Sequence, residues 1–262
     1  MLRLPIRLCL IAILLGGCAA GPDKRDPLES MNRKVYAFND TVDKAVLKPV
    51  TRVYVAVLPD LARTGVSNFF ANLGMVVTTL NDALQLKGEQ VPVDIMRFLV
   101  NTVFGIAGLI DVATELGIAR NSEDFGQTLG YWGVGSGPYL VLPLLGPSSI
   151  RDGAALPVDF AVSPLSGMLD SERERWALIG LRVVDMRSQL LTVDAVLAQQ
   201  LDPYSFLRDT YLQRREYLVR DGRPAPQPAE GSGTPRRKSL LELEEEEFGD
   251  EPVRPVGGEA VR

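Results

Sequence analysis

The stretch that decides the fold is residues 26–48, DPLESMNRKVYAFNDTVDKAVLK. Its apolar residues recur at steps of three and four, which places them on one face of an α-helix. These residues are Leu28, Met31, Val35, Phe38, Val42 and Val46. Because proline lacks the N–H that a helix interior needs, we expect this helix to end at Pro49. Residues 50–58 then fit either a strand or a short buried helix.

The helical period continues toward the C-terminus. Pro59-Asp60 opens a second helix, and the helical pattern persists until Gly88 breaks it. Gly105 and Gly108 then separate two further predicted helices. The predicted ranges are 60–73, 76–86, 91–104 and 106–116.

Two more helical regions are predicted beyond residue 170. Ser171 and Glu174 have the spacing of a capping box, and the apolar pattern behind them runs to Val196 and fits two pieces. Asp202 as the N-cap and Pro203 in the first turn start a final helix. Because helices dominate, with no series of alternating strands and no repeat period, the predicted fold class is all-α.

Two groups of charged residues on these helices are interpreted as solvent-facing. Asp111 and Glu115 have i,i+4 spacing, and nothing in the sequence places a substrate between them. The final helix carries an arginine group, for which a clamp on lipid phosphate is the alternative interpretation. This group is Arg208, Arg214, Arg215 and Arg220.

Two longer segments carry no charged residue. We interpret residues 98–110 as a core helix, and the alternative is a helix that rests within a lipid leaflet without spanning it. Residues 126–150 are long enough to span a bilayer, but six glycines and three prolines interrupt them. This segment fits equally a buried connector or one wall of a passage with apolar and polar sides.

The first residues have the three-part plan of a secretory signal. Arg3 and Arg7 form a positive region, residues 8–15 form an unbroken apolar run, and Gly16-Gly17 precede Cys18. The apolar run is much shorter than the ~20 residues of a membrane-spanning helix.

The sequence LGGC at residues 15–18 resembles the lipobox of bacterial lipoproteins, in which the cysteine carries a diacylglycerol. We therefore expect a signal peptide at 1–17 and an acyl-modified Cys18 on a polar tether at 18–25, which would anchor the chain to a membrane. The alternative is a plain signal peptide that is cleaved nearby.

Residue counts exclude several classes of protein. The two cysteines are Cys9, inside the signal, and Cys18, so no disulfide and no CxxC metal site is expected in the mature chain. The chain has no histidine, which excludes Ser-His-Asp and Cys-His catalysis and histidine-ligated zinc. Loss of Arg3 and Arg7 with the signal would change the formal charge from −5 to −7, which argues against nucleic-acid binding. We predict no metal, and no cofactor beyond the acyl modification.

The glycine-rich stretch at 133–137, GVGSG, matches neither of two known motifs. A nucleophile elbow needs G-x-S-x-G, but Val134 stands at the first glycine and no histidine exists to activate Ser136. A phosphate-binding G-x-G-x-x-G fails because Pro138 replaces the third glycine. We therefore predict no catalytic residue here.

The C-terminal residues 221–262 are rich in proline, glycine and acidic residues, with EEEE at 244–247. Their apolar area is too small to offset the entropy lost on ordering, so we expect a disordered acidic tail. The folded helical domain is accordingly assigned to residues 26–220.

Several blocks, in order along the chain, resemble the MlaA (VacJ) family of outer-membrane lipoproteins. They cover about residues 26–220, almost all of the predicted folded domain. The blocks are 26–33 (DPLESMNR) with Tyr36, Phe38 and Asn39, then 66–69 (VSNF), 97–102 (RFLVNT), 105–113 (GIAGLIDVA), 125–130 (FGQTLG), 133–139 (GVGSGPY), Leu142-Pro143, Arg151-Asp152, 202–204 (DPY) and Gln213-Arg214.

The resemblance implies a ring-like single domain of amphipathic helices with a Gly/Pro-rich irregular segment, lying in the inner leaflet of the outer membrane and facing the periplasm. It implies a central amphipathic channel that extracts mislocalised phospholipids from the outer leaflet and passes them to the periplasmic lipid carrier MlaC, which maintains lipid asymmetry. A trimeric porin is the other implied partner, and no enzymatic activity is implied. Ala19, where inner-membrane lipoproteins tend to have Asp, agrees with an outer-membrane location.

The candidate channel and loop residues come from the glycine-rich segment. We hypothesise that Gly135, Gly137 and Pro138 shape a mobile loop beside the channel. Apolar side chains after this loop would contact lipid tails. The candidates there are Tyr139, Leu142 and Pro143, with Leu140 and Leu144 beside them. Two alternative functions stay open. One is an adaptor lipoprotein that tethers other envelope proteins, and the other is a lipid hydrolase, which the missing histidine argues against.

Overall fold

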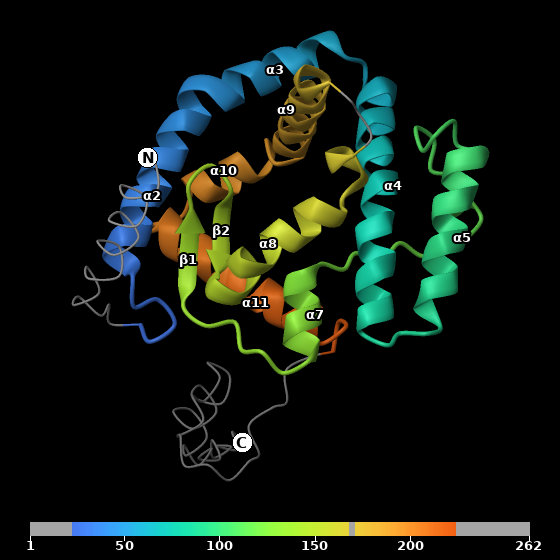
Figure 1. The fold of residues 1–262 in the computed structure, drawn as a ribbon. Coiled ribbons are helices and arrows are strands. Elements are labelled where there is room, and N and C mark those ends of the chain that lie inside the picture. Colours follow the sequence, from blue (N-terminus) through green and yellow to red (C-terminus); the bar gives the residue numbers. More distant parts are fainter. Residues whose placement is uncertain (1–22, 168–170, 224–262) are drawn as a thin grey trace, which may run out of the picture. The chain divides into compact units, whose positions relative to one another are not determined.

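A computed structural model describes residues 23–167 and 171–223 (Figure 1). The signal peptide, Cys18 and nearly all of the acidic tail lie outside the described residues, so those predictions stay predictions. The described residues belong to one compact unit, and it is helical apart from one small hairpin. The predicted all-α class is therefore confirmed. The elements are α2 (Glu29–Val42), the π-helical turn η1 (Asp43–Leu47), α3 (Lys48–Val57), α4 (Asp60–Leu84), α5 (Gln90–Val103), α6 (Val112–Glu115), α7 (Phe125–Tyr131), β1 (Tyr139–Leu142), β2 (Gly146–Ser149), α8 (Ile150–Val162), the 3-10 turn η2 (Pro164–Ser166), α9 (Glu172–Gln189), α10 (Val193–Ala198) and α11 (Pro203–Val219).

Contacts among the described elements close into a ring (Figure 1). The arc of α2 and α3 leads into α4, α4 contacts α7, and α7 contacts α11. Helix α11 contacts β2, β2 pairs with β1, and β1 contacts α2, which closes the ring. Helix α9 packs against α3 and α4 within the arc, whereas α5 packs against α4 on the outside. The ring-like arrangement expected from the family resemblance is confirmed.

The first helix does not end at Pro49, so that prediction is wrong. The chain continues from α2 through η1 into α3, and the ambiguous residues 50–58 are helical as far as Val57. In η1 the N–H of Lys48 donates to the carbonyl of Asp43, five residues back. A π-helical turn is wider than an α-helical turn, so it makes room for a proline ring that cannot donate a hydrogen bond.

The next helices follow the predicted pattern up to residue 104. The ranges 60–73 and 76–86 form one continuous helix, α4, and the range 91–104 matches α5. Of the predicted helix at 106–116, only Val112–Glu115 is helical (α6), and its first half is wrong because the backbone of Ile106 and Ala107 is left-handed, with φ of 53° and 56°. The β-branched side chain of Ile106 disfavours this conformation, so the loop could not be predicted from the residue pattern.

The uncharged segment 126–150 folds in three pieces: α7, a glycine-rich loop, and the antiparallel hairpin of β1 and β2. The hairpin pairs Tyr139 with Ser149 and Leu142 with Gly146, and the sequence had not predicted these short strands. Ser171 is the N-cap residue of α9, but among the described residues its side chain accepts no capping hydrogen bond, so the predicted capping box is not formed. Asp202 caps α11 as predicted, accepting a hydrogen bond from the N–H of Tyr204.

The interior of the described unit is unusually polar. More polar and charged side chains than apolar ones are fully buried, and the apolar core consists of small separate clusters. One cluster joins α4 to the η2 and α9 region, and the other joins β1 to α11. None of the helices in the described ranges combines the length and the hydropathy that crossing a bilayer requires.

Candidate functional site

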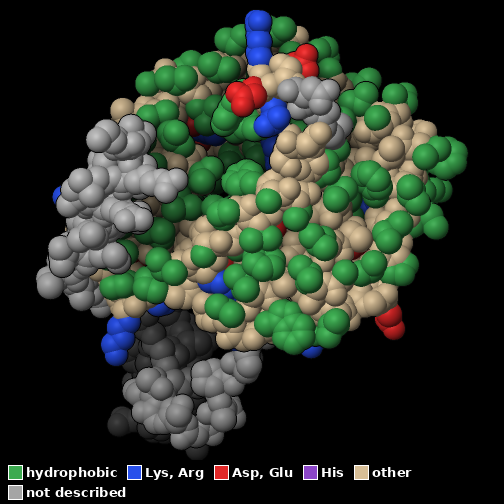
Figure 2. Space-filling model, in the orientation of Figure 1, with side chains coloured by type: hydrophobic (Ala, Val, Ile, Leu, Met, Phe, Trp, Pro, Cys, Tyr) green, Lys and Arg blue, Asp and Glu red, His purple; other side chains and the backbone are tan. Residues whose placement is uncertain are grey.

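Large apolar side chains gather on the surface of the unit. Helix α5 and the loop after it expose one group, and a stripe at helical spacing along η1, α3 and the start of α4 exposes another. Figure 2 shows hydrophobic side chains over much of the drawn face and within the hollow inside the arc of α2 and α3. Exposed apolar area of this extent marks a contact surface for lipid or protein. The two groups are Ile95, Met96, Leu99, Val103, Phe104, Ile106, Leu109 and Ile110, and Val46, Val50, Val53, Val57 and Leu61.

Backbone hydrogen bonds hold the exposed loop after α5 in one shape. The N–H of Ala107 donates to the carbonyl of Thr102 over 3.0 Å, and the N–H of Gly108 donates to the carbonyl of Asn101 over 2.8 Å. The Asn101 side chain accepts from the N–H of Ala113 over 2.8 Å. These bonds fix the left-handed residues and keep the apolar side chain of Ile106 on the surface. The loop is therefore a preformed apolar projection.

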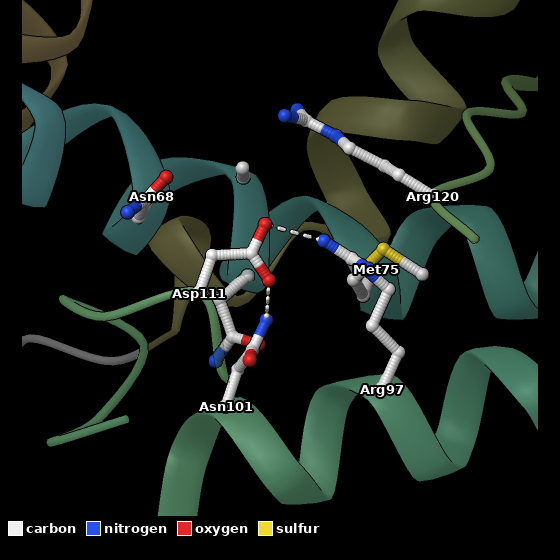
Figure 3. A pocket seen from close by; sticks show the side chains of 8 residues that line it. Asn68, Met75, Arg97, Asn101, Asp111 and Arg120 are labelled. Atoms are coloured by element: carbon white, nitrogen blue, oxygen red, sulfur yellow. Dashed lines mark hydrogen bonds and ion pairs between the residues drawn. The ribbon is translucent and has the colours of Figure 1, made fainter. Parts of the chain in front are cut away.

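A polar clamp lies beneath this loop. Figure 3 shows Arg97 and Asn101 reaching from α5 to Asp111, with an Arg97–Asp111 distance of 2.5 Å and an Asn101–Asp111 distance of 2.9 Å. Although burial opposes the effect, hydrogen bonds from Thr114 and Asn101 and the charge of Arg97 lower the pKa of Asp111. Asp111 therefore does not lie on a solvated face as predicted, but holds α6 to α5. The adjoining cavity of about 10 Å³ has room for one water molecule and not for a lipid.

The glycine-rich loop between α7 and β1 is tied to the start of α8. The carbonyls of Ser136 and Pro138 accept hydrogen bonds from the N–H groups of Arg151 and Ile150, each over 3.1 Å. Gly137 has a φ of +66°, and a Cβ at this position would lie 3.3 Å from the Cβ of Ile150. At Gly135 a Cβ would meet open space. The loop thus needs glycine at 137 more than at 135.

The tip of the β1–β2 hairpin is an apolar projection braced by one side chain. Asn39 on α2 donates to the carbonyl of Leu142 over 2.9 Å and accepts from the N–H of Leu144 over 2.8 Å. Pro143, Leu144 and Leu145 are exposed. The hairpin therefore presents apolar side chains at its tip while α2 fixes its position.

The base of the hairpin is buried in a polar and aromatic cluster. Asn32 donates to Asp26 over 2.8 Å and to the carbonyl of Tyr139 over 3.0 Å, and it accepts from the N–H of Val141 over 2.9 Å. Tyr204 of α11 donates its hydroxyl hydrogen bond to Asp26. Burial and the Asp26 carboxylate raise the pKa of Tyr204, so its phenol stays protonated. This cluster joins α2, β1 and α11.

The arginines of α11 are not all solvent-facing, which corrects the prediction for Arg208 and Arg215. Arg208 is buried beside Asp26. Arg215 binds the Asp124 and Asp152 carboxylates at distances from 2.5 to 3.0 Å. Although burial opposes the effect, hydrogen bonds from Tyr211 and Arg215 lower the pKa of Asp152. These charges close the ring, because Asp124 caps α7 and Asp152 lies in the first turn of α8.

Arg182 of α9 differs from these paired arginines. Burial lowers the pKa of its guanidinium, and no hydrogen bond or ion pair is found for it within residues 23–167 and 171–223. Asp185, one turn further along α9, instead accepts hydrogen bonds from Tyr54 and Ser67. A guanidinium stays charged in a protein, so Arg182 is a partly buried cation with the chemistry to accept an anionic ligand.

A comparison with protein families identifies the family to which this helical chain belongs. The family model described as MlaA lipoprotein matches residues 24–218. The chain belongs to the MlaA lipoprotein family. It is 37% identical over 238 residues to the intermembrane phospholipid transport system lipoprotein MlaA of Shigella flexneri, covering 85% of this chain and 92% of that protein. The MlaA protein of Escherichia coli K12 is also 37% identical, over 237 residues and with the same coverage.

A solved structure is also similar to this chain. One chain, described under "Structural basis for maintenance of bacterial outer membrane lipid asymmetry", aligns with a TM-score of 0.63 and 35% identity. The alignment covers 74% of this chain and 98% of that chain. An uncharacterised protein of Rickettsia bellii is 36% identical over 195 residues, covering 74% of this chain and 76% of that protein.

The residues predicted for the channel and its loop differ in how far they are buried. Gly135, Gly137, Pro138 and Pro143 lie on the surface, and Leu142 is partly buried. Tyr139 is 1% exposed and packs against Tyr204 and Val141. The structure thus brings these residues together on one loop and hairpin, with Tyr139 as the side chain that fixes the hairpin to the ring.

Arg182 is the candidate binding residue that was not predicted from the sequence. Its neighbour three residues along, Asp185, is at a spacing typical of an intrahelical ion pair. Only the tertiary contacts of Asp185 reveal that, within the part of the chain that the structure describes, the arginine has no such partner. The described ranges hold no group of His, Cys, Asp and Glu residues that could bind a metal ion.

Proposed function

We propose that this chain is an outer-membrane lipoprotein that extracts mislocalised phospholipids from the outer leaflet and passes them to a periplasmic lipid carrier, thereby maintaining lipid asymmetry. Its named relatives are phospholipid transport lipoproteins, which supports the transport of phospholipid. The central amphipathic channel of this proposal runs through the ring of helices. The chain is not proposed as an enzyme.

The single observation that carries this proposal is the partly buried Arg182 of α9, the helix that packs against α3 and α4. A phospholipid needs one group that neutralises its phosphate and apolar surface that accommodates its acyl chains. An arginine guanidinium binds phosphate oxygens in a bidentate manner. Hydrophobic side chains are visible in the hollow inside the arc of α2 and α3 (Figure 2). The site therefore has the mixed character that a lipid requires.

The exposed apolar surface supports embedding of the ring in the inner leaflet. Burying apolar area contributes roughly 25 cal/mol per Å², so the exposed side chains of α3 and α5 favour contact with acyl chains over water. The acyl group on Cys18 would supply a second attachment. The trimeric porin and the carrier MlaC remain proposed partners, the porin beside the ring in the membrane and the carrier on the periplasmic side.

The proposal is tested by the lipid that co-purifies with the full-length protein. Arg182→Glu reverses the charge at the site, and we expect it to lose most of the phospholipid detected by mass spectrometry. The matched control is Arg214→Glu, which changes an exposed arginine on α11. In cells, Arg182→Glu should raise the amount of phospholipid in the outer leaflet, and Arg214→Glu should not.

The alternatives give other outcomes in the same preparation. An adaptor lipoprotein would carry no stoichiometric phospholipid, and the two arginine variants would then be indistinguishable from the unmodified chain. A hydrolase would release fatty acid from labelled phospholipid. Either result would overturn lipid transport as the function of this ring.

A further inference from the structure

A buried pair of carboxyl groups joins α4 to α5, away from Arg182. Asp82 and Asp94 are both 0% exposed. One oxygen of each is hydrogen-bonded: Asn121 donates to Asp82 Oδ2 over 2.7 Å, and Gln90 donates to Asp94 Oδ1 over 3.0 Å. The other two oxygens, Asp82 Oδ1 and Asp94 Oδ2, are buried without a hydrogen-bond partner among the described residues.

Asp82 on α4 and Asp94 on α5 belong to two helices that pack against each other, and each keeps one buried oxygen without a donor among the described residues. Two neighbouring buried carboxyl groups repel when both are ionised. A single proton between the two carboxyl groups supplies the missing donor and removes one charge. A shared proton accounts for both unpaired oxygens at once.

The surrounding charges do not neutralise the pair. Lys87, in the turn between α4 and α5, lies 3.7 Å from Asp82 Oδ1 and 3.1 Å from Glu123 Oε1, and it also pairs with Asp221 after α11. One ammonium group thus serves several carboxylates. No third metal-ligating side chain completes a cation site around Asp82 and Asp94 in the described ranges, so the geometry favours a proton over a metal ion.

We propose that Asp82 and Asp94 form a proton-binding site whose shared proton holds α4 and α5 to the segment 118–124, and that losing this proton in alkali loosens the joint. The proton thereby links the outer helix α5 to the ring. This site is separate from lipid transport, and its test does not depend on transport activity.

The direction of the pH effect follows from the folded environment of Asp82. Burial, followed by the hydrogen bond and the charge of Asp94, raises the pKa of Asp82 to about 8. Its ordinary value is about 3.9. A carboxyl group with a higher pKa in the folded state binds a proton on folding. Its contribution to stability is therefore complete below about pH 4, declines as the pH rises, and is lost above about pH 8.

Infrared titration of the full-length protein in detergent tests the shared proton directly. Ordinary carboxyl groups are ionised at pH 6.5, so the carbonyl band of a protonated acid at that pH reports a buried one. We expect the band to shrink in Asp82→Asn and to be unchanged in Asp60→Asn, a control at an exposed aspartate. An identical band in Asp82→Asn and the unmodified chain would overturn the proposal.

Thermal unfolding tests the consequence for the joint. Asparagine at 82 keeps an oxygen for Asn121 and offers an N–H in place of the shared proton. We expect the Tm of the unmodified chain to fall by about 3–5 °C more than that of Asp82→Asn between pH 6.5 and pH 9. Asp94→Asn should behave like Asp82→Asn, because the amide introduced at position 94 can donate a hydrogen bond to the carboxylate of Asp82. If neither variant changed the pH dependence, the shared proton would be excluded.

Trypsin cleavage at Lys87 tests where the loosening occurs. Lys87 lies in the turn that the pair stabilises, and three carboxylates restrain its side chain. Comparing variants at each pH cancels the pH dependence of the protease. We expect cleavage at Lys87 to be several-fold faster in the unmodified chain than in Asp82→Asn at pH 9, and equal at pH 6.5. Equal rates at both values would contradict a local joint.

Discussion

At the scale of single residues, Asn32 shows how the polar interior is held together. Its amide bridges Asp26 and strand β1 through Tyr139 and Val141, and it is fully buried. Asn32→Ala leaves buried donors and acceptors unpaired, at ~1–3 kcal/mol each, so we expect the free energy of unfolding to fall by about 3 kcal/mol. Urea denaturation of the full-length protein measures this. The control is Asn39→Ala, which removes an equivalent bridge at the partly exposed hairpin tip and should cost about 1 kcal/mol. Equal losses would contradict burial as the cause.

Residue environments were only partly predictable. Arg208 and Arg215 are seven residues apart and share a helix face with Tyr204 and Tyr211, so the period alone could have placed them with the buried tyrosines. The positive charge of these arginines had instead favoured the interpretation that they face solvent. Their carboxylate partners lie in distant parts of the sequence, and only the fold brings them together. That Arg182 has no partner among the described residues likewise depends on tertiary contacts.

At the scale of elements, the loop before β1 offers a functional test. Proline requires a φ near −65°, so Gly137→Pro cannot adopt the observed φ of +66° and must move the loop away from α8. We expect outer-leaflet phospholipid to rise in cells that carry this variant at normal protein level. Gly135→Ala is the matched control, because its methyl group meets open space and should leave lipid asymmetry intact. Normal asymmetry with Gly137→Pro would remove the loop from the transport mechanism.

Helix types and most boundaries could be predicted, whereas the exceptions depend on local hydrogen bonding. The period of apolar residues located α2, α4, α5, α9 and α11. The π-helical turn before Pro49 and the left-handed Ile106 contradict intrinsic preferences, so no sequence rule would have predicted them. At residues 106–110 the bonds from Asn101 and Thr102 outweigh the preference of a branched residue for extended or helical backbone.

At the scale of the whole molecule, the distribution of apolar surface decides how the ring meets a membrane. The charge-free segments 98–110 and 126–150 could be recognised in the sequence as candidates for lipid contact. Their burial could not be predicted from the sequence, because a core helix and a lipid-facing helix have similar composition. The structure shows their apolar side chains exposed at Phe104, Ile106 and Leu144. Both segments therefore contribute apolar side chains to the surface of the described unit.

This surface predicts that the acyl anchor is not the only membrane attachment. If Cys18→Ser removes the anchor, the exposed apolar side chains still favour the leaflet, so we expect much of the protein to remain in the membrane fraction and to need detergent. Adding Phe104→Asp and Ile106→Asn should release it, since both remove apolar surface at the projecting loop. Asparagine tolerates the left-handed backbone at 106 better than isoleucine, so this variant retains the fold. A Cys18→Ser protein that was monodisperse in plain buffer would show that the ring itself does not lie in the leaflet.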